Sequence, residues 1–301
     1  MYSKILVPLD TSKTAEQVLP HARYLAGKLG ISVELLTVID IAEIGRRIAA
    51  DKAPVLNTLI ENAVRSSESY LGAIAGTFSG VDVRVTVEKG VPDETIIEKG
   101  EADRSMLLAM ATHGRSGLDR FLLGSVAEKV LRATANPLLL ARAAQEVKWE
   151  GEGGFKTIIV PLDGSEVAEK VLPTVAVMAK HLGAEVMLVR VYHIPYTAFA
   201  ADEGFVALEY DKLLAGVRDE TNEYLEKKAA EVKNLGVEKV AWLAKEGLAA
   251  DEIIALGRNT PDALIAMSSH GRSGVKRLML GSVTETVVRH TRDPVLVVRD
   301  R

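Results

Sequence analysis

The amino-acid sequence predicts an α/β protein made of two doubly wound parallel sheets of five strands each. Two observations carry this prediction. One unit occurs twice in the 301 residues, because "ILVPLDTSKTAEQVLP" beginning at Ile5 returns as "IIVPLDGSEVAEKVLP" beginning at Ile158. Inside each copy, short apolar runs alternate with helical patterns, which is typical of parallel sheets covered by helices on both faces. The fold is therefore expected to be a duplication.

The seam between the two copies reads "AAQEVKWEGEGGFK". It is charged and rich in glycine, which is typical of a flexible connection. We predict a first domain at residues 1–142, a linker at 143–154 and a second domain at 155–301. A period this long, present only twice, indicates two copies of one domain and excludes a solenoid.

Each copy contains five candidate strands, most of them continuous apolar runs of the kind found in strands buried on both faces. In the first copy they are Lys4–Leu9, Val33–Ile39, Val83–Val87, Met106–Met110 and Leu138–Ala141. Their counterparts in the second copy are Thr157–Leu162, Glu185–Val191, Val240–Ala244, Ala263–Met267 and Val295–Val298.

The first strand of each copy is expected to lead into an amphipathic helix. Its apolar face is Ala15, Val18, Leu19, Ala22, Ala26 and Leu29 in the first copy, and Ala168, Val171, Leu172, Val175, Ala179 and Leu182 in the second. Ser12 and Ser165 are candidate N-caps. Pro20 and Pro173 lie inside the pattern, so either the helix kinks there or its regular part begins later.

Composition excludes several classes of function. The formal net charge is −4, so no overall positive field attracts nucleic acid or an anionic membrane. The chain has no cysteine, which excludes disulfides, thiolate nucleophiles and thiolate metal sites. No apolar stretch reaches the roughly 20 residues of a membrane-spanning helix, and the N-terminus has no signal-peptide pattern. We expect a cytoplasmic protein.

A glycine-rich stretch follows the fourth strand of each copy. It reads "ATHGRSGLDRFLLGSV" from Ala111 and "SSHGRSGVKRLMLGSV" from Ser268. In open α/β sheets, ligands bind at the carboxyl ends of the strands. A helix that begins after a glycine-rich turn presents backbone amides, and phosphate is the usual occupant. The stretch therefore indicates a phosphate site in each copy.

The same residues allow a purely structural interpretation. Ser125 with Glu128, and Ser282 with Glu285, fit the capping box S-x-x-E. The serines could then only start a helix and the glycines only form a turn, although capping and anion binding are compatible. Neither a P-loop nor a G-x-G-x-x-G fingerprint is present.

"VPLD", then "MATHG" or "MSSHG", then "GSV" and a final "NPLLL" or "DPVLVV" together resemble the universal stress protein family over nearly the whole chain. The resemblance implies a Rossmann-like or flavodoxin-like sheet in the order 3-2-1-4-5, and ATP as ligand. Nucleotide-binding members carry G-x2-G-x9-G-[ST]. Ala111 and Ser268 stand here where that motif has its first glycine, and both are small enough for a ligand to pass close to the backbone.

The resemblance also implies which residues contact the nucleotide. In the first copy they are Pro8, Asp10, Val38, Met110, Ala111, Gly114, Gly124, Ser125 and Val126. In the second copy they are Pro161, Asp163, Val191, Met267, Ser268, Gly271, Gly281, Ser282, Val283 and Thr284. A bound Mg²⁺ would help offset phosphate repulsion. Asp10 and Asp163 could instead cap a helix or form turns after the first strand, because aspartate suits both roles.

The two sites are not expected to be equal. Thr284 offers a hydroxyl where the first copy has Ala127. The second loop also carries Lys276 and Arg277, against Asp119 and Arg120 in the first. Phosphate favours donors and positive charge, so we predict tighter ATP binding in the second copy.

A catalytic interpretation would use His113 and His270 as acid or base, with Arg115 and Arg272 as phosphate clamps. No nucleophile accompanies them, so we assign no catalytic residue. The sequence favours a regulator or sensor with little or no turnover. A weak ATPase or phosphotransferase, and a scaffold with degenerate sites, stay as alternatives.

The residues from Tyr192 to Tyr210 concentrate aromatic side chains. They could form a lid or a partner surface, but ordinary packing against the sheet is favoured. The resemblance further implies that the two domains pair through their last strands, giving an internal pseudo-dimer. Two chains are then expected to form a homodimer.

Overall fold

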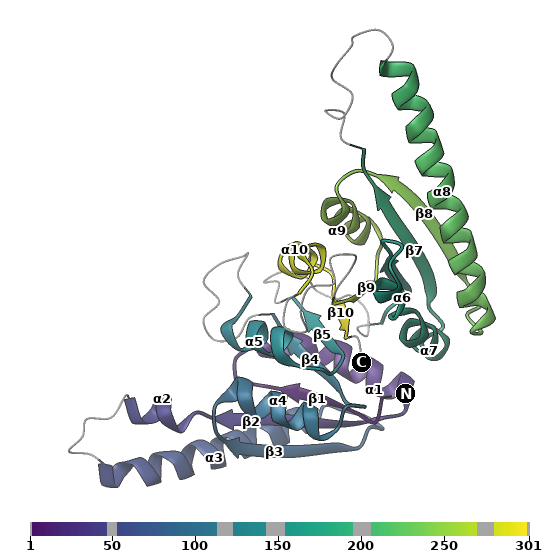
Figure 1. The fold of residues 1–301 in the computed structure, drawn as a ribbon. Coiled ribbons are helices and arrows are strands. Elements are labelled where there is room, and N and C mark those ends of the chain that lie inside the picture. The colour runs from purple at the N-terminus through teal and green to yellow at the C-terminus, as the bar shows by residue number, and fades with distance from the viewer. Residues whose placement is uncertain are drawn as a thin grey trace.

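The computed structural model describes residues 2–46, 53–112, 123–142, 154–194, 206–269 and 280–299. Its strands form a single ten-stranded sheet in the order β3-β2-β1-β4-β5-β10-β9-β6-β7-β8 (Figure 1). The predicted linker falls almost wholly outside the described residues, so the domain boundaries stay a prediction.

Each half of the sheet has the order 3-2-1-4-5, counted within its own half. The first half contains β1 (Lys4–Pro8), β2 (Ser32–Ile39), β3 (Val83–Lys89), β4 (Leu107–Ala111) and β5 (Leu138–Ala141). The second contains β6 (Thr157–Pro161), β7 (Glu185–Tyr192), β8 (Val240–Glu246), β9 (Ala263–Ser268) and β10 (Val295–Val298). All ten predicted strands are confirmed, and within each half every pair is parallel.

The two five-stranded sheets are not separate. Strand β10 pairs antiparallel with β5, so that Val295 lies opposite Leu140 and Val297 lies opposite Leu138. Both strands are buried along their whole length. Because each of them would otherwise expose a row of unpaired backbone groups, the pairing removes two sheet edges at once. The last strands are the ones through which the resemblance implied that the halves would meet.

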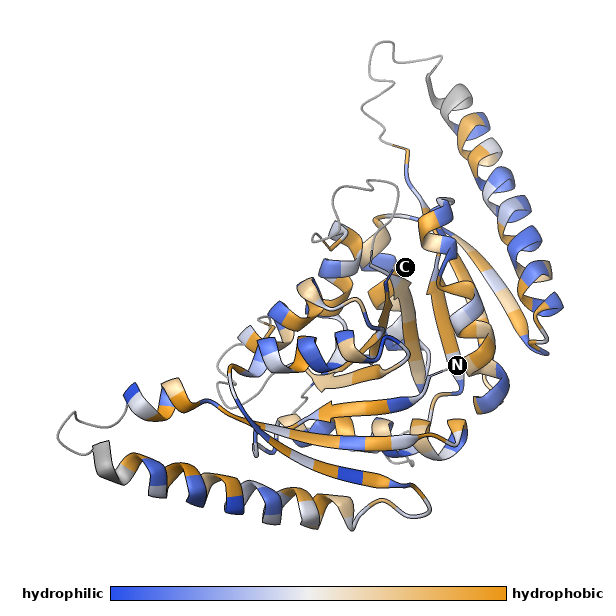
Figure 2. Cartoon of the chain, turned by 60° about the horizontal axis from the view of Figure 1, so that its bottom comes forward, coloured by the Kyte–Doolittle hydropathy of each residue, from blue (hydrophilic) through white to orange (hydrophobic). Residues whose placement is uncertain are grey.

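Helices cover both faces of the sheet (Figure 1). The helices are η1 (Ala15–Val18), α1 (Leu19–Leu29), α2 (Ile41–Arg46), α3 (Ala53–Ala75), α4 (Pro92–Ala102), α5 (Ser125–Ala133), α6 (Glu166–Glu169), α7 (Leu172–Leu182), α8 (Val206–Asn234), α9 (Ala249–Asn259) and α10 (Ser282–His290). Helices α1, α3, α7 and α8 pack on one face, and α4, α5, α9 and α10 on the other. Figure 2 shows apolar strands between helices whose outer faces are polar.

The proline-containing helices begin late and do not kink. A short 3-10 turn, η1, comes first, and α1 then begins at Leu19 with Pro20 in its first turn. This position tolerates proline because the missing amide would have no partner there. Ser165 caps α6 as predicted, through a hydrogen bond from the Ala168 amide at 3.2 Å. Ser12 makes the equivalent bond with Ala15, but the N-cap of η1 is Thr14, so that assignment was wrong.

Phe155 joins the two halves just before β6. Its side chain is 1% exposed. Its ring stacks on His21 with the centroids 5.2 Å apart, and it meets Tyr24 edge to face at 5.9 Å. Both partners lie on α1 of the first half. The core therefore continues across the seam on the face covered by α1 and α7.

Glu34 is a buried carboxylate on β2, 4% exposed. It accepts hydrogen bonds from Lys4 Nζ at 2.9 Å and from Lys99 Nζ at 3.0 Å. Burial alone would raise the pKa of Glu34, but the two ammonium groups outweigh it and lower the pKa from 4.5 to about 2. The ionised form is therefore the one that the fold stabilises.

This shift gives the protein an acid-sensitive contribution to stability. The folded pKa of Glu34 lies below its unfolded value, so the contribution is complete above pH 4.5 and is lost as the pH falls toward about 2. We expect wild type to lose about 2 kcal/mol over that window that Glu34→Gln does not lose. Urea unfolding at a series of pH values measures this. Glu88→Gln is the control, because Glu88 pairs with Lys99 but is 39% exposed; an equal pH effect in both variants would contradict the assignment.

Candidate nucleotide site

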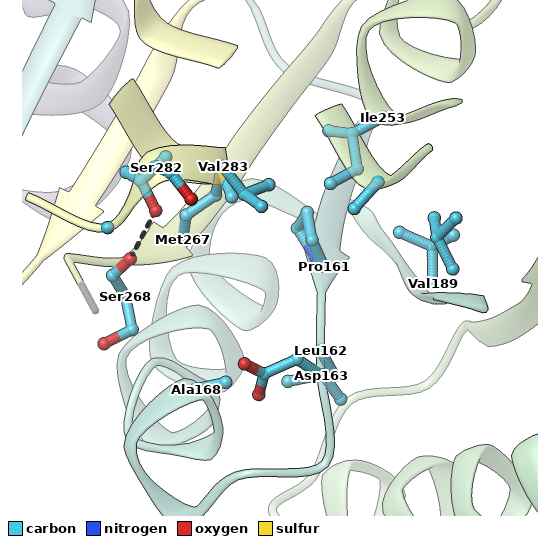
Figure 3. A pocket seen from close by; sticks show the side chains of 14 residues that line it. Pro161, Leu162, Asp163, Ala168, Val189, Ile253, Met267, Ser268, Ser282 and Val283 are labelled. Atoms are coloured by element: carbon cyan, nitrogen blue, oxygen red, sulfur yellow. Dashed lines mark hydrogen bonds between the residues drawn. The ribbon is translucent and has the colours of Figure 1, made fainter. Parts of the chain in front are cut away.

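The carboxyl ends of β6, β7 and β9 meet at a pocket in the second half (Figure 3). Its volume is about 260 Å³, close to the lower end of small-molecule sites at roughly 300 Å³. The lining residues are Pro161, Leu162, Asp163, Ala168, Val189, Val191, Ala249, Ile253, Met267, Ser268, Gly281, Ser282, Val283 and Thr284. The pocket lies where open parallel sheets bind their ligands.

Nine of the ten residues that the sequence suggested for the second copy line this one pocket. They come from four separate places in the chain: the end of β6, the end of β7, the end of β9 and the start of α10. The tenth, Gly271, lies outside the described residues, as do His270, Arg272, Lys276 and Arg277. The fold therefore brings together nine of the residues that the resemblance implied.

The start of α10 forms one wall of the pocket. Its N-cap is Gly281, with φ −62° and ψ 142°, and within the described residues no side-chain cap of the helix is present. The first amides of any helix have no partner within the helix, and a glycine N-cap puts no side chain in front of them. Residues 282 to 284 therefore present backbone donors at the pocket wall. The start of α5 is built alike, with Gly124 as N-cap.

The capping-box interpretation is wrong in both halves, because the N-caps are the glycines and the serines are the first helical residues. The two glutamates instead reach across the seam between the halves. Glu285 Oε1 accepts a hydrogen bond from Arg132 at 3.0 Å, and Glu128 Oε1 accepts one from Arg289 at 3.0 Å. Ser125 and Ser282 therefore do not act as N-caps of these helices.

Asp163 shapes the turn after β6. Its Oδ1 accepts hydrogen bonds from the Ser165 amide at 2.9 Å and from the Ser165 hydroxyl at 2.6 Å. Asp10 holds Ser12 in the same way, at 3.0 and 2.6 Å. The turn-forming role of both aspartates is confirmed. Asp163 also lines the pocket, so the turn holds its carboxyl group at the site (Figure 3).

Thr284 has a different role from the one expected of it. Its hydroxyl donates to the backbone carbonyl of Ser268 at 3.0 Å, and its side chain is 4% exposed. The bond ties the first turn of α10 to the end of β9. Ala127 is buried at the matching place of α5 and has no hydroxyl to make such a bond. Thr284 therefore fixes the pocket wall.

The first half places its predicted residues at the equivalent points of the fold. Pro8 ends β1, Val38 lies near the end of β2, and Met110 and Ala111 end β4. Asp10 forms its turn, and Gly124, Ser125 and Val126 begin α5. The part of the glycine stretch that contains Gly114, and with it His113, Arg115, Asp119 and Arg120, lies outside the described residues.

Five lining residues were not predicted: Leu162, Ala168, Val189, Ala249 and Ile253. Ala249 and Ile253 are four residues apart on α9, which places them on one helix face. Ala168 was assigned to a helix face directed at the core. Apolar residues at helical spacing look the same in a sequence whether they face a core or a pocket.

A group of charged and aromatic side chains in the second half has a counterpart in the first. Tyr224 on α8 donates to Glu169 at 2.8 Å, and the Arg190 guanidinium lies 4.8 Å from its ring centroid. Burial and the neighbouring Glu169 raise the pKa of Tyr224. Tyr70 and Glu16 repeat the hydroxyl–carboxylate contact in the first half at 3.2 Å. In the aromatic segment, residues 195–205 lie outside the described part of the chain, so its lid, partner and packing interpretations stay open.

Two further observations concern metal ions and membranes. Within the described part of the chain, no three His, Cys, Asp or Glu side chains lie close enough together to hold a metal ion. No helix in the described ranges has both the length and the apolar character needed to cross a membrane.

Comparison with known proteins gives one result along the whole chain. A model of the universal stress protein family matches residues 1–142 and 154–299. A universal stress protein of Methanocaldococcus jannaschii is 32% identical over 142 residues, which are 47% of this chain and 83% of that protein. One from Mycolicibacterium smegmatis is 23% identical over 307 residues, covering 99% of this chain and 97% of its own. The crystal structure of a universal stress protein from Archaeoglobus fulgidus shares the fold, with a TM-score of 0.69 at 22% identity over 99% of both chains.

Proposed function

The chain belongs to the universal stress protein family, and from this premise we propose that it binds ATP as a cytoplasmic stress-response regulator with little or no turnover. The observation that carries the proposal is the pocket at the start of α10, lined by nine of the ten residues suggested for the second site. The first half places equivalent residues at equivalent points and is proposed as a second, weaker site.

The geometry supports binding of an anion beside an apolar group. Backbone amides at the start of α10 suit phosphate, while Val189, Val191, Ile253 and Met267 offer an apolar surface to a base. Micromolar affinity needs about −8 kcal/mol. Three or four amide–phosphate contacts at roughly 1.5–3 kcal/mol each, together with burial of the base, reach that value before the entropy of binding is subtracted. A lysine of the P-loop kind is not required.

Little turnover is proposed because few groups at the pocket can transfer a proton. Asp163 is the single ionisable residue among the described residues that line it, and its Oδ1 is engaged by Ser165. Asp163 alone does not supply three ligands for Mg²⁺. The ion would therefore arrive with the nucleotide, coordinated mainly by phosphate oxygens.

The β5–β10 pairing supports the further proposal that the chain is an internal pseudo-dimer. The two halves contribute matching strands, matching helices and matching ion pairs to their contact. We propose a homodimer of such chains as the assembled form, which sedimentation equilibrium of the purified protein tests by its mass.

The proposal is tested by counting the ATP bound per chain. Equilibrium dialysis of the full chain with Mg²⁺ present is expected to give at least one ATP per chain. Val191→Trp extends an aromatic ring into the pocket from β7, where Val191 is only partly buried, and is expected to remove one bound ATP. Val38→Trp is the matched variant in the first half.

The two tryptophan variants also distinguish the sites. We expect Val191→Trp to abolish the tighter phase of binding and Val38→Trp to leave that phase intact. Undiminished ATP binding by Val191→Trp would exclude the pocket as the site, and tighter binding in the first half would reverse the proposed ranking. A phosphate-release assay on the same samples separates a regulator from a weak ATPase.

A further inference from the structure

The ten-stranded sheet ends in two edge strands, β3 in the first half and β8 in the second (Figure 1). An edge strand presents a row of backbone N–H and C=O groups with which a further strand can pair. Among the described residues, no strand pairs with the outer side of either one. Each edge is therefore a surface on which a second copy of the chain could dock, and the two edges differ in what they allow.

The backbone of β3 shows which of its residues an added strand would meet. The Val33 amide donates to Asp82 O at 2.9 Å, and the Gly90 amide donates to Ile39 O at 3.1 Å. The even-numbered residues therefore turn their backbone groups toward β2. Because this direction alternates along a strand, the odd-numbered residues from 83 to 89 turn their backbone groups outward.

Two-fold symmetry limits the registers in which the same edge of two chains can pair. Antiparallel pairing of two identical edges into one sheet requires a two-fold axis perpendicular to that sheet. Such an axis keeps every side chain on its own face, so a residue can lie opposite only a residue an even number of positions away. The whole of β3 is paired when Thr86, its middle residue, lies opposite its own copy.

In this register the side chains of β3 are complementary on both faces. Arg84 lies opposite Glu88 of the second copy, and symmetry repeats the contact. Arg84 is exposed and makes no ion pair with another described residue, while Glu88 contacts Lys99 Nζ at 2.7 Å. On the other face Val85 lies opposite Val87 of the second copy, and both valines already pack on the core of the first half. Opposite charges and β-branched pairs are both favourable across an antiparallel pair.

Strand β8 does not allow such charge pairing. The charged residues in and beside it are Glu238, Lys239, Lys245 and Glu246. The glutamates stand at even positions and the lysines at odd positions. No two-fold register can therefore place a lysine opposite a glutamate, and charge complementarity favours β3.

Resting on the proposed homodimer, we propose that two chains associate through β3, paired antiparallel with its own copy and centred on Thr86. The sheet then continues from one chain into the other, with β8 of each chain at its outer ends. The two Arg84–Glu88 contacts fix the register, because they form only when the whole of β3 is paired.

Cross-linking tests the register directly, because the chain has no cysteine of its own. Thr86 turns its backbone toward β2, so it would face its copy as a non-hydrogen-bonded pair. The Cα atoms of such a pair lie about 4.5 Å apart, within the range of a disulfide. We expect Thr86→Cys in the full chain to form a disulfide-linked dimer on mild oxidation.

Leu243→Cys is the matched control for the cross-link. Leu243 lies beside Val189 in β8 as Thr86 lies beside Leu36 in β3, and its side chain is 37% exposed. A thiol at residue 243 is expected to remain without a cross-link under the same conditions.

Charge reversal tests the Arg84–Glu88 contact. Arg84→Glu places like charges opposite each other twice, and we expect it to raise the Kd of the dimer, measured by sedimentation, at least about tenfold at low salt. The increase should become smaller at high salt. Lys239→Glu is the control, because it makes the same change of net charge beside β8, where Lys239 is exposed.

The outcomes separate this inference from the proposals on which it rests. A wild-type chain that sediments as a monomer overturns the homodimer and the inference together. A wild-type dimer in which Thr86→Cys fails to cross-link, or in which Leu243→Cys cross-links instead, overturns the inference alone. Equal effects of Arg84→Glu and Lys239→Glu on the Kd of the dimer also overturn it. Neither readout requires nucleotide, so failure of ATP binding leaves the test intact.

Discussion

Replacing Asn136 by aspartate is expected to destabilise the first half of the protein by about 3–5 kcal/mol, the usual cost of leaving a buried charge without a partner. Asn136 is 0% exposed. Its Nδ2 donates to Asp103 O at 2.9 Å and to Met106 O at 3.1 Å, which holds the turn before β5 against the one before β4. A carboxylate has no proton for either carbonyl oxygen and would be repelled by both.

The second half provides a natural counterpart, because Asp293 stands before Pro294 as Asn136 stands before Pro137. Burial raises the pKa of Asp293, while the Thr291 hydroxyl, which donates at 3.0 Å, and Arg258 lower it. Asp293 is only partly buried, so its charge is tolerated there. Asp293→Asn removes that charge and restores two donors, and we expect it to stabilise the second half by about 1 kcal/mol.

Urea unfolding of both variants at neutral and mildly acidic pH measures the two predicted changes in stability. The loss in Asn136→Asp should shrink as the pH falls, because protonation of the new carboxyl group removes its charge and supplies one donor. A loss below about 1 kcal/mol at neutral pH, or a loss independent of pH, would show that the buried amide does not hold the turn.

The strands were predictable from local pattern, and the place of the pocket at the carboxyl ends of the strands was predictable from a strong topological rule, whereas the individual lining residues were implied by the family resemblance. Continuous apolar runs such as Val295–Val298 identify buried strands. The carboxyl ends of parallel strands meet at one edge of the sheet, which is enough to bring Asp163 and Gly281 to one place. Neither the identification of the strands nor the placing of their carboxyl ends at one edge requires knowledge of a distance in the folded protein.

The role of Glu285 was not predictable, because its partner is remote in the chain. The S-x-x-E spacing occurs in a capping box. It occurs equally in any helix that begins with a serine and has a glutamate as its fourth residue. The choice depends on Arg132, which is 153 positions away and is brought near only when β5 pairs with β10. Thr284 illustrates the same limit, since its acceptor on β9 is fixed by packing and not by local spacing.

Arg289→Glu is expected to weaken the contact between the halves by about 3 kcal/mol, chiefly through repulsion between like charges. Arg289 Nη2 donates to Glu128 Oε1 and to Glu285 Oε1, both at 3.0 Å, and Arg132 donates to the same two carboxylates. A new carboxylate at residue 289 removes the charge-assisted bonds that Arg289 makes to Glu128 and Glu285, and it faces these two like charges. At about 4 Å and an effective dielectric constant near 20, such a repulsion approaches 4 kcal/mol before solvent screening, and partial exposure of the groups reduces it.

Bonds between arginines and helix C-termini at the same seam should limit the loss of stability in this variant. Arg142 donates to Thr291 O at 2.8 Å, at the C-terminus of α10, and Arg299 donates to Leu131 O near the C-terminus of α5. Each half thus places an arginine on the carbonyl end of the other half's helix, where a positive charge is favourable. With these contacts and the β5–β10 ladder intact, Arg289→Glu should fold and still lose cooperativity between its halves.

Denaturant unfolding followed by far-UV circular dichroism measures the effect. We expect wild type to unfold in one transition, and Arg289→Glu to unfold earlier or in two separated steps, with the difference reduced at high salt because the interaction is ionic. Arg65→Glu is the matched control. Arg65 faces Glu61 at 3.9 Å within α3, and both side chains are about 70% exposed, so reversing its charge should change stability by less than roughly 0.5 kcal/mol. Equal effects of the two reversals would mean that the carboxylates at the seam are as well solvated as a surface pair. The halves would then be held together by the paired strands, the apolar core and the bonds from Arg142 and Arg299 to the helix ends.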